Sequence, residues 1–218
     1  PEEGHRLPHS PLNAIVAPRP IGWITSISEA GLINLAPFSF FNALTGNPPC
    51  VMFCPNGFKP GTKEPKDSLT NAEATGEFVF NMATYALREQ VNLSSARLAP
   101  EVDEMDLCGL TKVPSTLVKP PRVGESPVNM ECKYHCTLTL PANSANTVHH
   151  VVVGEVIGIH INEEFITDGK VDWVKIQPLA RMGYLDYTYV SQVFTMDPPR
   201  GEVRPEQIGE PTKAKKPG

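Results

Sequence analysis

The sequence lacks several features that define large classes of proteins. No apolar run approaches about 18 residues and no signal-peptide pattern is present, so nothing indicates membrane insertion or secretion. There is no H-E-x-x-H pattern, no Ser/His/Asp signature and no G-x-G-x-x-G dinucleotide motif. The formal net charge is −5, whereas nucleic-acid partners require a basic surface. We therefore expect no membrane span, no nucleic-acid partner and no Rossmann domain.

Cysteine is also sparse, and the five residues form an odd number. Without a secretion signal, a cytoplasmic location is the simpler expectation. Cys50 and Cys54, like Cys132 and Cys136, are four positions apart, which on a strand separates their α-carbons by about 13 Å. Neither pair could then form a disulfide or share a metal ion. We expect these four cysteines to be buried structural residues.

Proline, by contrast, is abundant, with 23 residues in a chain of 218. Short apolar runs separated by turn residues predict a single, mainly β domain with antiparallel strands and two or three short helices. We expect this domain to cover residues 13–196, between an N-terminal arm of residues 1–12 and a proline-rich, charged tail of residues 197–218.

The stretch of residues 17–49 holds the densest set of structural signals. Residues 21–28 combine β-branched and aromatic side chains, and Gly31 follows in a turn before the apolar residues 32–35, so we predict a β-hairpin. Pro37 then favours an edge or bulge, because it removes a backbone donor. Phenylalanines at 38, 40 and 41 alternate with Ser39 and Asn42. These residues are either plain core or the wall of a pocket for a flat aromatic molecule.

A second candidate site lies at residues 66–75. Helix-forming residues 67–75 precede Gly76, which predicts a short helix with its N-terminus near Lys66. The free backbone N–H groups, the Ser68 hydroxyl and the Lys66 ammonium could together bind a phosphate dianion. We expect Asp67 to cap the helix through its side chain. An ordinary capped helix with a solvated lysine is the alternative.

The remaining elements come from apolar periodicity. We predict strands at residues 51–54, 77–82, 128–140, 148–161 and 171–176, and a helix at residues 86–96 capped by Thr84. Strict alternation over residues 128–140 predicts one core face and one wet or partner-binding face. Gly154 and Gly158 would allow bending or a close backbone approach. His149 and His150 lie on opposite faces, and either could be solvated or functional.

Five segments in this order resemble the flavin reductase-like FMN-binding split-barrel family, which includes flavoredoxins and the reductase components of two-component monooxygenases. They are PRPIGWITSIS with GLINLAPFSFFN (residues 18–42), KDSLTNAEATGEFVFNM (66–82), SPVNMECKYHCTLTL (126–140), HHVVVGEVIGIHI (149–161) and PLARMGYLDYT (178–188). Many members carry two glycines where this chain has Gly183 and Tyr184.

The resemblance implies an FMN-binding split β-barrel that forms a homodimer with the flavin near the interface. It implies an oxidoreductase that takes electrons from NAD(P)H and passes them to flavin, a monooxygenase or another acceptor. The residues that it assigns to the flavin ring are Trp23, Thr25, Ser26, Ala36, Phe38, Ser39, Asn42 and Thr45. The phosphate is expected at Lys66, Ser68 and the N–H groups that open the Asp67–Thr75 helix, and Asp67 completes the cofactor-binding set as the cap of that helix.

Two alternative functions remain open at this point. A non-catalytic flavin-binding electron carrier would hold flavin but oxidise NAD(P)H slowly. A pyridoxamine phosphate oxidase-like enzyme would need a second basic cluster for its phosphorylated substrate, and the sequence has no obvious one.

Overall fold

The computed structural model describes residues 4, 6–9, 11–59, 61–99, 101–196 and 198. Most of the expected tail of residues 197–218, and part of the expected arm of residues 1–12, therefore lie outside the described residues. Among the described residues no helix is long and apolar enough to cross a membrane.

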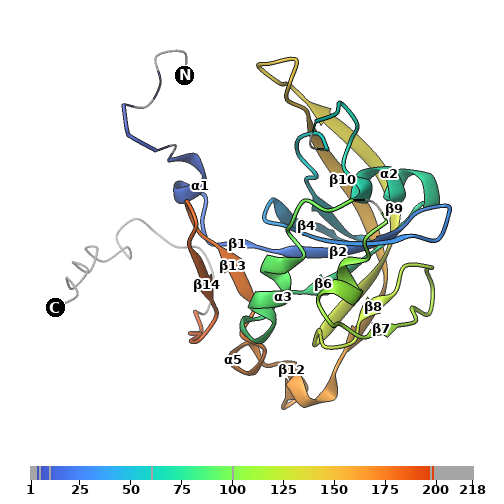
Figure 1. Ribbon diagram of the computed structural model, residues 1–218. Coiled ribbons are helices and arrows are strands. Elements are labelled where there is room, and N and C mark those ends of the chain that lie inside the picture. Colours follow the sequence, from blue (N-terminus) through green and yellow to red (C-terminus); the bar gives the residue numbers. More distant parts are fainter. Residues whose placement is uncertain are drawn as a thin grey trace.

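The helices are short and peripheral (Figure 1). They are α1 (Leu12–Ile15), α2 (Asp67–Thr75), α3 (Arg88–Leu93), α4 (Glu104–Leu107) and α5 (Trp173–Ile176), with 3₁₀ turns at Tyr85–Leu87 and Glu163–Phe165. The strands are β1 (Arg19–Pro20), β2 (Gly22–Ile27), β3 (Ile33–Phe38), β4 (Phe41–Gly46), β5 (Pro49–Phe53), β6 (Glu77–Met82), β7 (Lys112–Val113), β8 (Arg122–Val123), β9 (Val128–Leu140), β10 (His149–Ile161), β11 (Ile166–Thr167), β12 (Lys170–Val171), β13 (Leu179–Arg181) and β14 (Tyr187–Tyr189).

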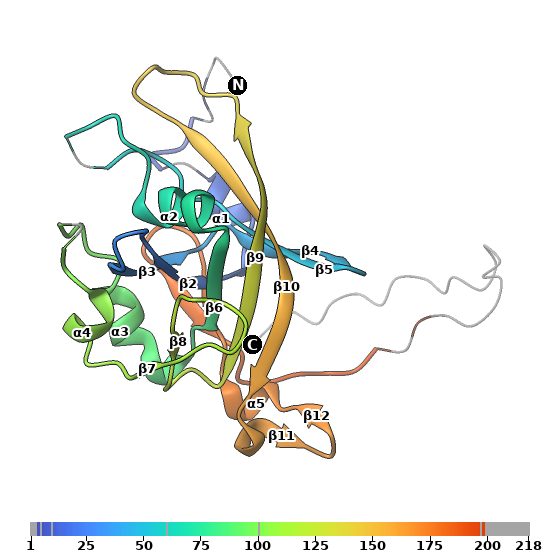
Figure 2. The same cartoon turned by 90° about the vertical axis from the view of Figure 1, so that its right-hand side faces the viewer.

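The largest sheet in the described part of the chain has seven antiparallel strands in the order β3-β2-β6-β9-β10-β5-β4. β2 and β4 are not neighbours in this order, yet a Cβ on Gly22 would lie 2.5 Å from the ring of Phe41. The sheet therefore curls until its β4 end packs against β2 and β6, and only glycine leaves room for that contact. Figure 2 shows the long strands β9 and β10 crossing the molecule, with the β4–β5 hairpin projecting from it.

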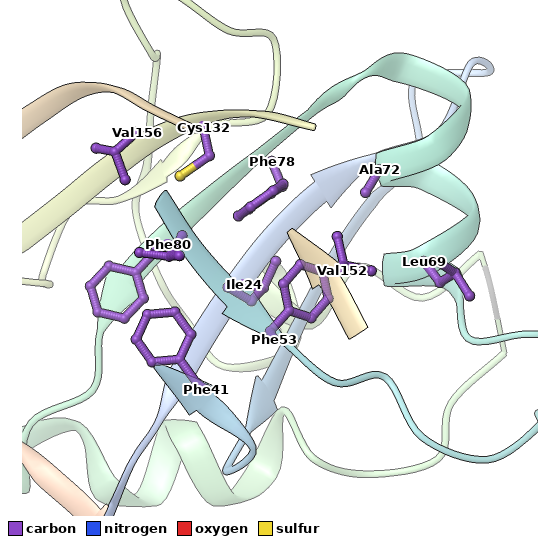
Figure 3. Close-up of a cluster of buried hydrophobic side chains, with 11 residues drawn as sticks. Ile24, Phe41, Phe53, Leu69, Ala72, Phe78, Phe80, Cys132, Val152 and Val156 are labelled. Atoms are coloured by element: carbon purple, nitrogen blue, oxygen red, sulfur yellow. The ribbon is translucent and has the colours of Figure 1, made fainter. Parts of the chain in front are cut away.

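The interior of the curled sheet is aromatic (Figure 3). Phe41 stacks on Phe80 with ring centroids 4.8 Å apart, and Phe53 meets Phe78 edge-on at 5.2 Å. Leu69 and Ala72 of α2 pack onto the same cluster, so α2 is fixed to the sheet by its apolar face. Gly154 lies where a Cβ would come within 2.4 Å of Phe78, and the β9–β10 register shifts at Gly154 and Gly158.

A smaller sheet, β1-β13-β14, lies beside the main one, next to α1 (Figure 1). Trp23, Leu35 and Met105 belong to a second core cluster with Val91 of α3 and Leu179 of β13. This cluster joins the back of the β2–β3 hairpin to α3, α4 and the small sheet.

Several local predictions are confirmed. The 21–28/32–35 hairpin is β2–β3, residues 67–75 form α2 with Gly76 left-handed at φ +72°, and Glu77–Met82 and Val128–Leu140 are strands over the expected residues. β3, which contains Pro37, is an edge strand as expected.

Four local predictions are wrong. Residues 171–176 form the end of β12 and then α5, because the Asp172 carboxylate accepts a hydrogen bond from the Lys175 N–H and starts a helical turn. The helix expected at residues 86–96 is present over residues 86–93, as part of a 3₁₀ turn and α3, but the predicted cap is wrong because Thr84 makes no side-chain cap.

The other two errors concern burial. Of the four cysteines expected to be buried, only Cys132 is fully buried, while Cys50, Cys54 and Cys136 are half-buried. The alternation over β9 does not separate a core face from a wet face, since Asn129 and Glu131 are buried as well as Val128 and Cys132. Segments 116–118 and 123 cover that second face of β9 and donate backbone hydrogen bonds to its polar side chains or accept from them.

Candidate flavin site

A cavity of about 810 Å³ lies between the N-terminus of α2, the end of β3 and the segment that follows α3. Ligand pockets in proteins commonly measure about 300–1,000 Å³. Its lining combines apolar residues with charged, amide and hydroxyl groups. The apolar residues are Ala36, Pro37, Phe38, Phe40, Cys54, Ala96, Leu98 and Ala99, and the polar ones are Asn34, Asn56, Lys59, Thr62, Glu64, Lys66, Asp67, Ser68, Ser94, Ser95, Arg97 and Glu104.

Lys66 is the residue immediately before α2, and it is half-buried in the cavity wall. Burial lowers the pKa of Lys66, and the nearby Arg97 guanidinium lowers it further. Among the described residues, neither cation has a carboxylate within 4.0 Å. The charge of Asp67 acts in the opposite direction on the pKa of Lys66, but Asp67 is paired with Lys59, so the two neighbouring cations keep a positive potential in this part of the cavity.

The start of α2 adds donors to the same place. The carbonyl of Lys66 accepts from Leu69 and Thr70, whereas the N–H groups of Asp67 and Ser68 have no acceptor among the described residues. Ser68 accepts a 2.9 Å hydrogen bond from the Asn34 amide, which leaves the Ser68 hydroxyl proton available to a ligand. The helix N-terminus, Ser68 and the two cations therefore form an anion-binding arrangement.

The prediction that the Asp67 side chain caps α2 is wrong, because the N-cap residue is Lys66 and no side chain caps the helix. The Asp67 carboxylate instead pairs with the Lys59 ammonium at 2.6 Å, and Lys59 also lies 3.7 Å from Glu64. The side-chain hydrogen bond to Asp67 is the main cause of the raised pKa of Lys59. Asp67 thus neutralises Lys59 and makes no ion pair with Lys66.

Glu104, the first residue of α4, lines the cavity and is almost fully buried. One of its carboxylate oxygens accepts the Leu35 N–H of edge strand β3 at 2.9 Å. Burial raises the pKa of Glu104. The carboxylate thus closes the back of the cavity and fixes β3 there.

The predicted site residues do not all meet in one place. Ala36, Phe38, Lys66, Asp67 and Ser68 line the cavity. The other six lie outside the cavity lining, three on β2 and three at or on β4.

Trp23, Thr25 and Ser26 are fully buried in β2, one layer behind the cavity. Two of them bond to groups of the cavity wall or of α2: the Trp23 indole N–H donates to Ser94 at 2.9 Å, and the Ser26 hydroxyl accepts from Asn71 at 3.1 Å. Thr25 accepts from Asn81 at 2.7 Å. These side chains position the wall of the cavity.

Ser39, Asn42 and Thr45 lie at or on the projecting β4 strand, outside the cavity. Asn42 is exposed and its side-chain oxygen accepts from the Ala43 N–H, while the Thr45 hydroxyl donates to the Pro48 carbonyl at 2.6 Å.

Sequence reasoning missed Asn34, Arg97 and Glu104 in the cavity wall. For Glu104 a signal existed, because Asp103 is a good N-cap residue and its carboxylate accepts from Met105 and Asp106. Arg97 is a lone basic residue among small ones, and no local pattern places it beside Lys66.

The flavin reductase-like domain family matches residues 16–180. The chain belongs to this family.

Its relatives include an uncharacterised protein of Halalkalibacterium halodurans, 34% identical over 91% of this chain and 92% of that protein. Among solved structures, component B of nitrilotriacetate monooxygenase from Bacillus cereus is similar with a TM-score of 0.76 and 27% identity, over 85% of this chain and 91% of the other. The 2-nitrobenzoate 2-nitroreductase of Pseudomonas fluorescens gives a TM-score of 0.75 at 26% identity, over 89% and 91%.

Flavoredoxin of Desulfovibrio vulgaris, at 18% identity and a TM-score of 0.71 over 88% and 96%, shares the fold. The predicted mainly β, split-barrel fold of this flavin reductase-like family is confirmed.

Proposed function

We propose that the protein binds FMN in the cavity beside α2 and works as a flavin-dependent oxidoreductase. The observation that carries this proposal is the division of the cavity into an aromatic, apolar part and a cationic part. FMN has the same division, with a flat ring at one end and a phosphate dianion at the other. Its neutral ribityl chain would pass the hydroxyl and amide groups between them.

The phosphate would lie at the start of α2. Lys66, Ser68 and the free N–H groups of Asp67 and Ser68 are its proposed ligands, and Arg97 adds a second positive charge. Asp67 would take part through its backbone, because its carboxylate is paired with Lys59.

The ring would lie against Ala36 and Phe38. Trp23, Thr25 and Ser26 would support that wall from behind and hold the cavity in shape. When bound, the flavin would supply hydride and single-electron chemistry, while this chain binds it, orients it and keeps water from it.

NAD(P)H is the proposed electron donor, and flavin or a partner protein the proposed acceptor. The similarity to component B of a monooxygenase supports an oxygenase component as that partner. The five cysteines are all free thiols, which supports a reducing compartment such as the cytoplasm.

A homodimer is also proposed, with β4 at the interface. β4 is an edge strand whose residues after Phe41 are all exposed, and Leu44 is 49% exposed. Such an edge readily pairs with a second chain. Ser39, Asn42 and Thr45 would then contact the flavin of the second copy.

This dimer can be tested by sedimentation together with flavin titration. Changing Ser39 and Asn42 to alanine should weaken FMN binding if both contact the ring, since each buried hydrogen bond lost costs about 1–3 kcal/mol. A monomer that binds FMN tightly, or a double variant of unchanged affinity, would remove β4 from the site.

The main test is a titration of wild type and Lys66→Ala with FMN and with riboflavin, which lacks the phosphate. A charge-assisted hydrogen bond contributes about 1.5–3 kcal/mol, so Lys66→Ala should lower FMN affinity by roughly one to two decades. Riboflavin affinity should barely change. Lys63→Ala is the matched control, because Lys63 is exposed and does not line the cavity. An equal loss for both flavins would show that Lys66 does not bind the phosphate.

Steady-state oxidation of NADH and NADPH, with and without added FMN, tests the catalytic part. Rapid oxidation with flavin supports the reductase. Tight FMN binding with only slow oxidation would support an electron carrier instead.

A further inference from the structure

A second cavity, of about 410 Å³, lies between α3 and the small sheet. Its lining contains three tyrosines, and the rings of Tyr85 and Tyr189 are 4.4 Å apart. The Arg88 guanidinium lies 4.4 Å from the centre of the Tyr85 ring. Asn92 and Thr188 add hydrogen-bonding groups to the lining, and Glu89, which pairs with Arg88 at 3.4 Å, adds a carboxylate at its exposed side. Flat aromatic walls with an arginine and an amide suit a heteroaromatic base, which stacks on the rings and bonds through its edge.

This cavity is linked to the proposed flavin site by a pair of arginines. Arg19 of β1 and Arg181 of β13 are cross-strand partners. The Arg19 guanidinium lies 5.7 Å from the ring of Phe40, which lines the flavin cavity. The Arg181 guanidinium lies 4.4 Å from the ring of Tyr187, which lines the second cavity.

The arginine pair is not neutralised locally. Among the described residues, neither Arg19 nor Arg181 has a carboxylate within 4.0 Å, and their hydrogen bonds go to backbone carbonyls such as Met182 and Tyr184. Within the described part of the chain the buried Arg19 Nε has no hydrogen-bond partner. The two positive charges therefore lie beside Phe40 of one cavity and Tyr187 of the other without a paired carboxylate.

We propose that the second cavity binds the adenosine half of the dinucleotide electron donor, with the Arg19–Arg181 pair beside its pyrophosphate. This inference rests on the proposed NAD(P)H donor. The nicotinamide would then reach the flavin cavity near Phe40, while adenine stacks on Tyr189 and Tyr85. A chain without a Rossmann motif would in this way bind a dinucleotide across two cavities.

The direct test is calorimetric titration of the FMN-loaded protein with adenosine monophosphate, which needs no turnover. Wild type should bind it, and Tyr189→Ala should weaken binding roughly tenfold, since stacking on an aromatic side chain contributes that much per base or more. Asn92→Ala is a second variant on the exposed face of α3, and it should also weaken binding. Phe194→Ala is the matched control, because this aromatic residue is 84% exposed and lines neither cavity.

A kinetic comparison uses NADH and reduced nicotinamide mononucleotide, which lacks the adenosine half. Tyr189→Ala should raise the KM for NADH roughly tenfold and leave the KM for the mononucleotide unchanged. Equal KM changes for both donors, or no binding of adenosine monophosphate by wild type, would overturn the proposal. If neither donor is oxidised, the proposed reductase activity fails, and the calorimetric titration alone still decides the adenosine site.

Discussion

Two buried glutamates show how differently this fold treats the same chemical group. Glu131 of β9 is completely buried among strands, and Glu104 of α4 is buried at the back of the proposed flavin cavity. Glu131 receives hydrogen bonds from Thr116, Leu117 and Val118, and pairs with the His160 ring at 2.5 Å. The Glu104 carboxylate accepts a hydrogen bond from the Leu35 N–H of β3.

The partner sets explain opposite pKa shifts. Burial acts to raise the pKa of both carboxyls, but in Glu131 the backbone donors and His160 outweigh it and hold the pKa below its usual value. In Glu104 burial prevails and the pKa is raised. A buried carboxylate with a full set of hydrogen bonds, such as Glu131, stabilises the fold. Among the described residues, Glu104, Lys66 and Arg97 have fewer hydrogen bonds or no ion pair, and all three line the proposed flavin cavity.

The largest expected effect on stability is therefore at Glu131. Glu131→Ala would leave three backbone N–H groups and His160 without their acceptor, so we expect a loss of roughly 3–5 kcal/mol in the free energy of unfolding. Urea unfolding of the variant measures this loss. Glu73→Ala, an exposed change on α2, should cost less than about 1 kcal/mol. A loss that small for Glu131→Ala would mean that the Glu131 hydrogen bonds contribute little to the free energy of unfolding.

The same site predicts sensitivity to acid. A carboxyl whose folded pKa is lowered stabilises the fold fully above its unfolded pKa, near 4.3, and loses that contribution as the pH falls through the lower, folded value. Unfolding free energy measured from pH 6 to pH 3 should fall more steeply in wild type than in Glu131→Ala. Parallel curves would assign the acid sensitivity to other carboxylates.

A smaller effect is expected at the cationic part of the flavin cavity. The pKa of Lys66 is lowered in the flavin-free protein, and a bound phosphate would raise it again. FMN affinity should then be full below the lowered pKa and should fall, by up to roughly tenfold, as the pH rises through it. Riboflavin affinity should not follow this profile, and Lys66→Ala should abolish it. An FMN profile that matches the riboflavin profile would exclude Lys66 as the phosphate ligand.

The sequence predicted the parts of the fold that local chemistry controls. Gly76 ends α2 because the backbone there is in the left-handed conformation, which glycine adopts readily. The β2–β3 hairpin follows from a turn between two runs of strand-forming residues. Prediction from the sequence failed where a cap competed with an apolar run, as at residues 171–176, where the Asp172 carboxylate starts the helical turn of α5 within the expected strand.

The candidate site was only half predictable for a different reason. Lys66 and Ser68 are marked by the helix that they begin, so a local pattern indicates them. Arg97 lies on the irregular segment after α3, and Glu104 reaches the cavity because α4 packs against β3, so no local pattern places either residue at the cavity. Trp23, conversely, looks like a ring-stacking residue by its type, but its burial and its bond to Ser94 place it behind the wall.

The smallest expected change is at Glu104 itself. Glutamine keeps an oxygen for the Leu35 N–H but carries no charge, so Glu104→Gln should alter the free energy of unfolding by less than about 1 kcal/mol at pH 5. A glutamate with a raised folded pKa costs stability as the pH rises from its unfolded to its folded value. Urea unfolding at pH 5 and pH 7.5 should therefore show that the free energy of unfolding of the variant, relative to that of wild type, is higher at pH 7.5. A loss of about 3 kcal/mol at both pH values would mean that the fold requires the charge of Glu104, as we expect for Glu131.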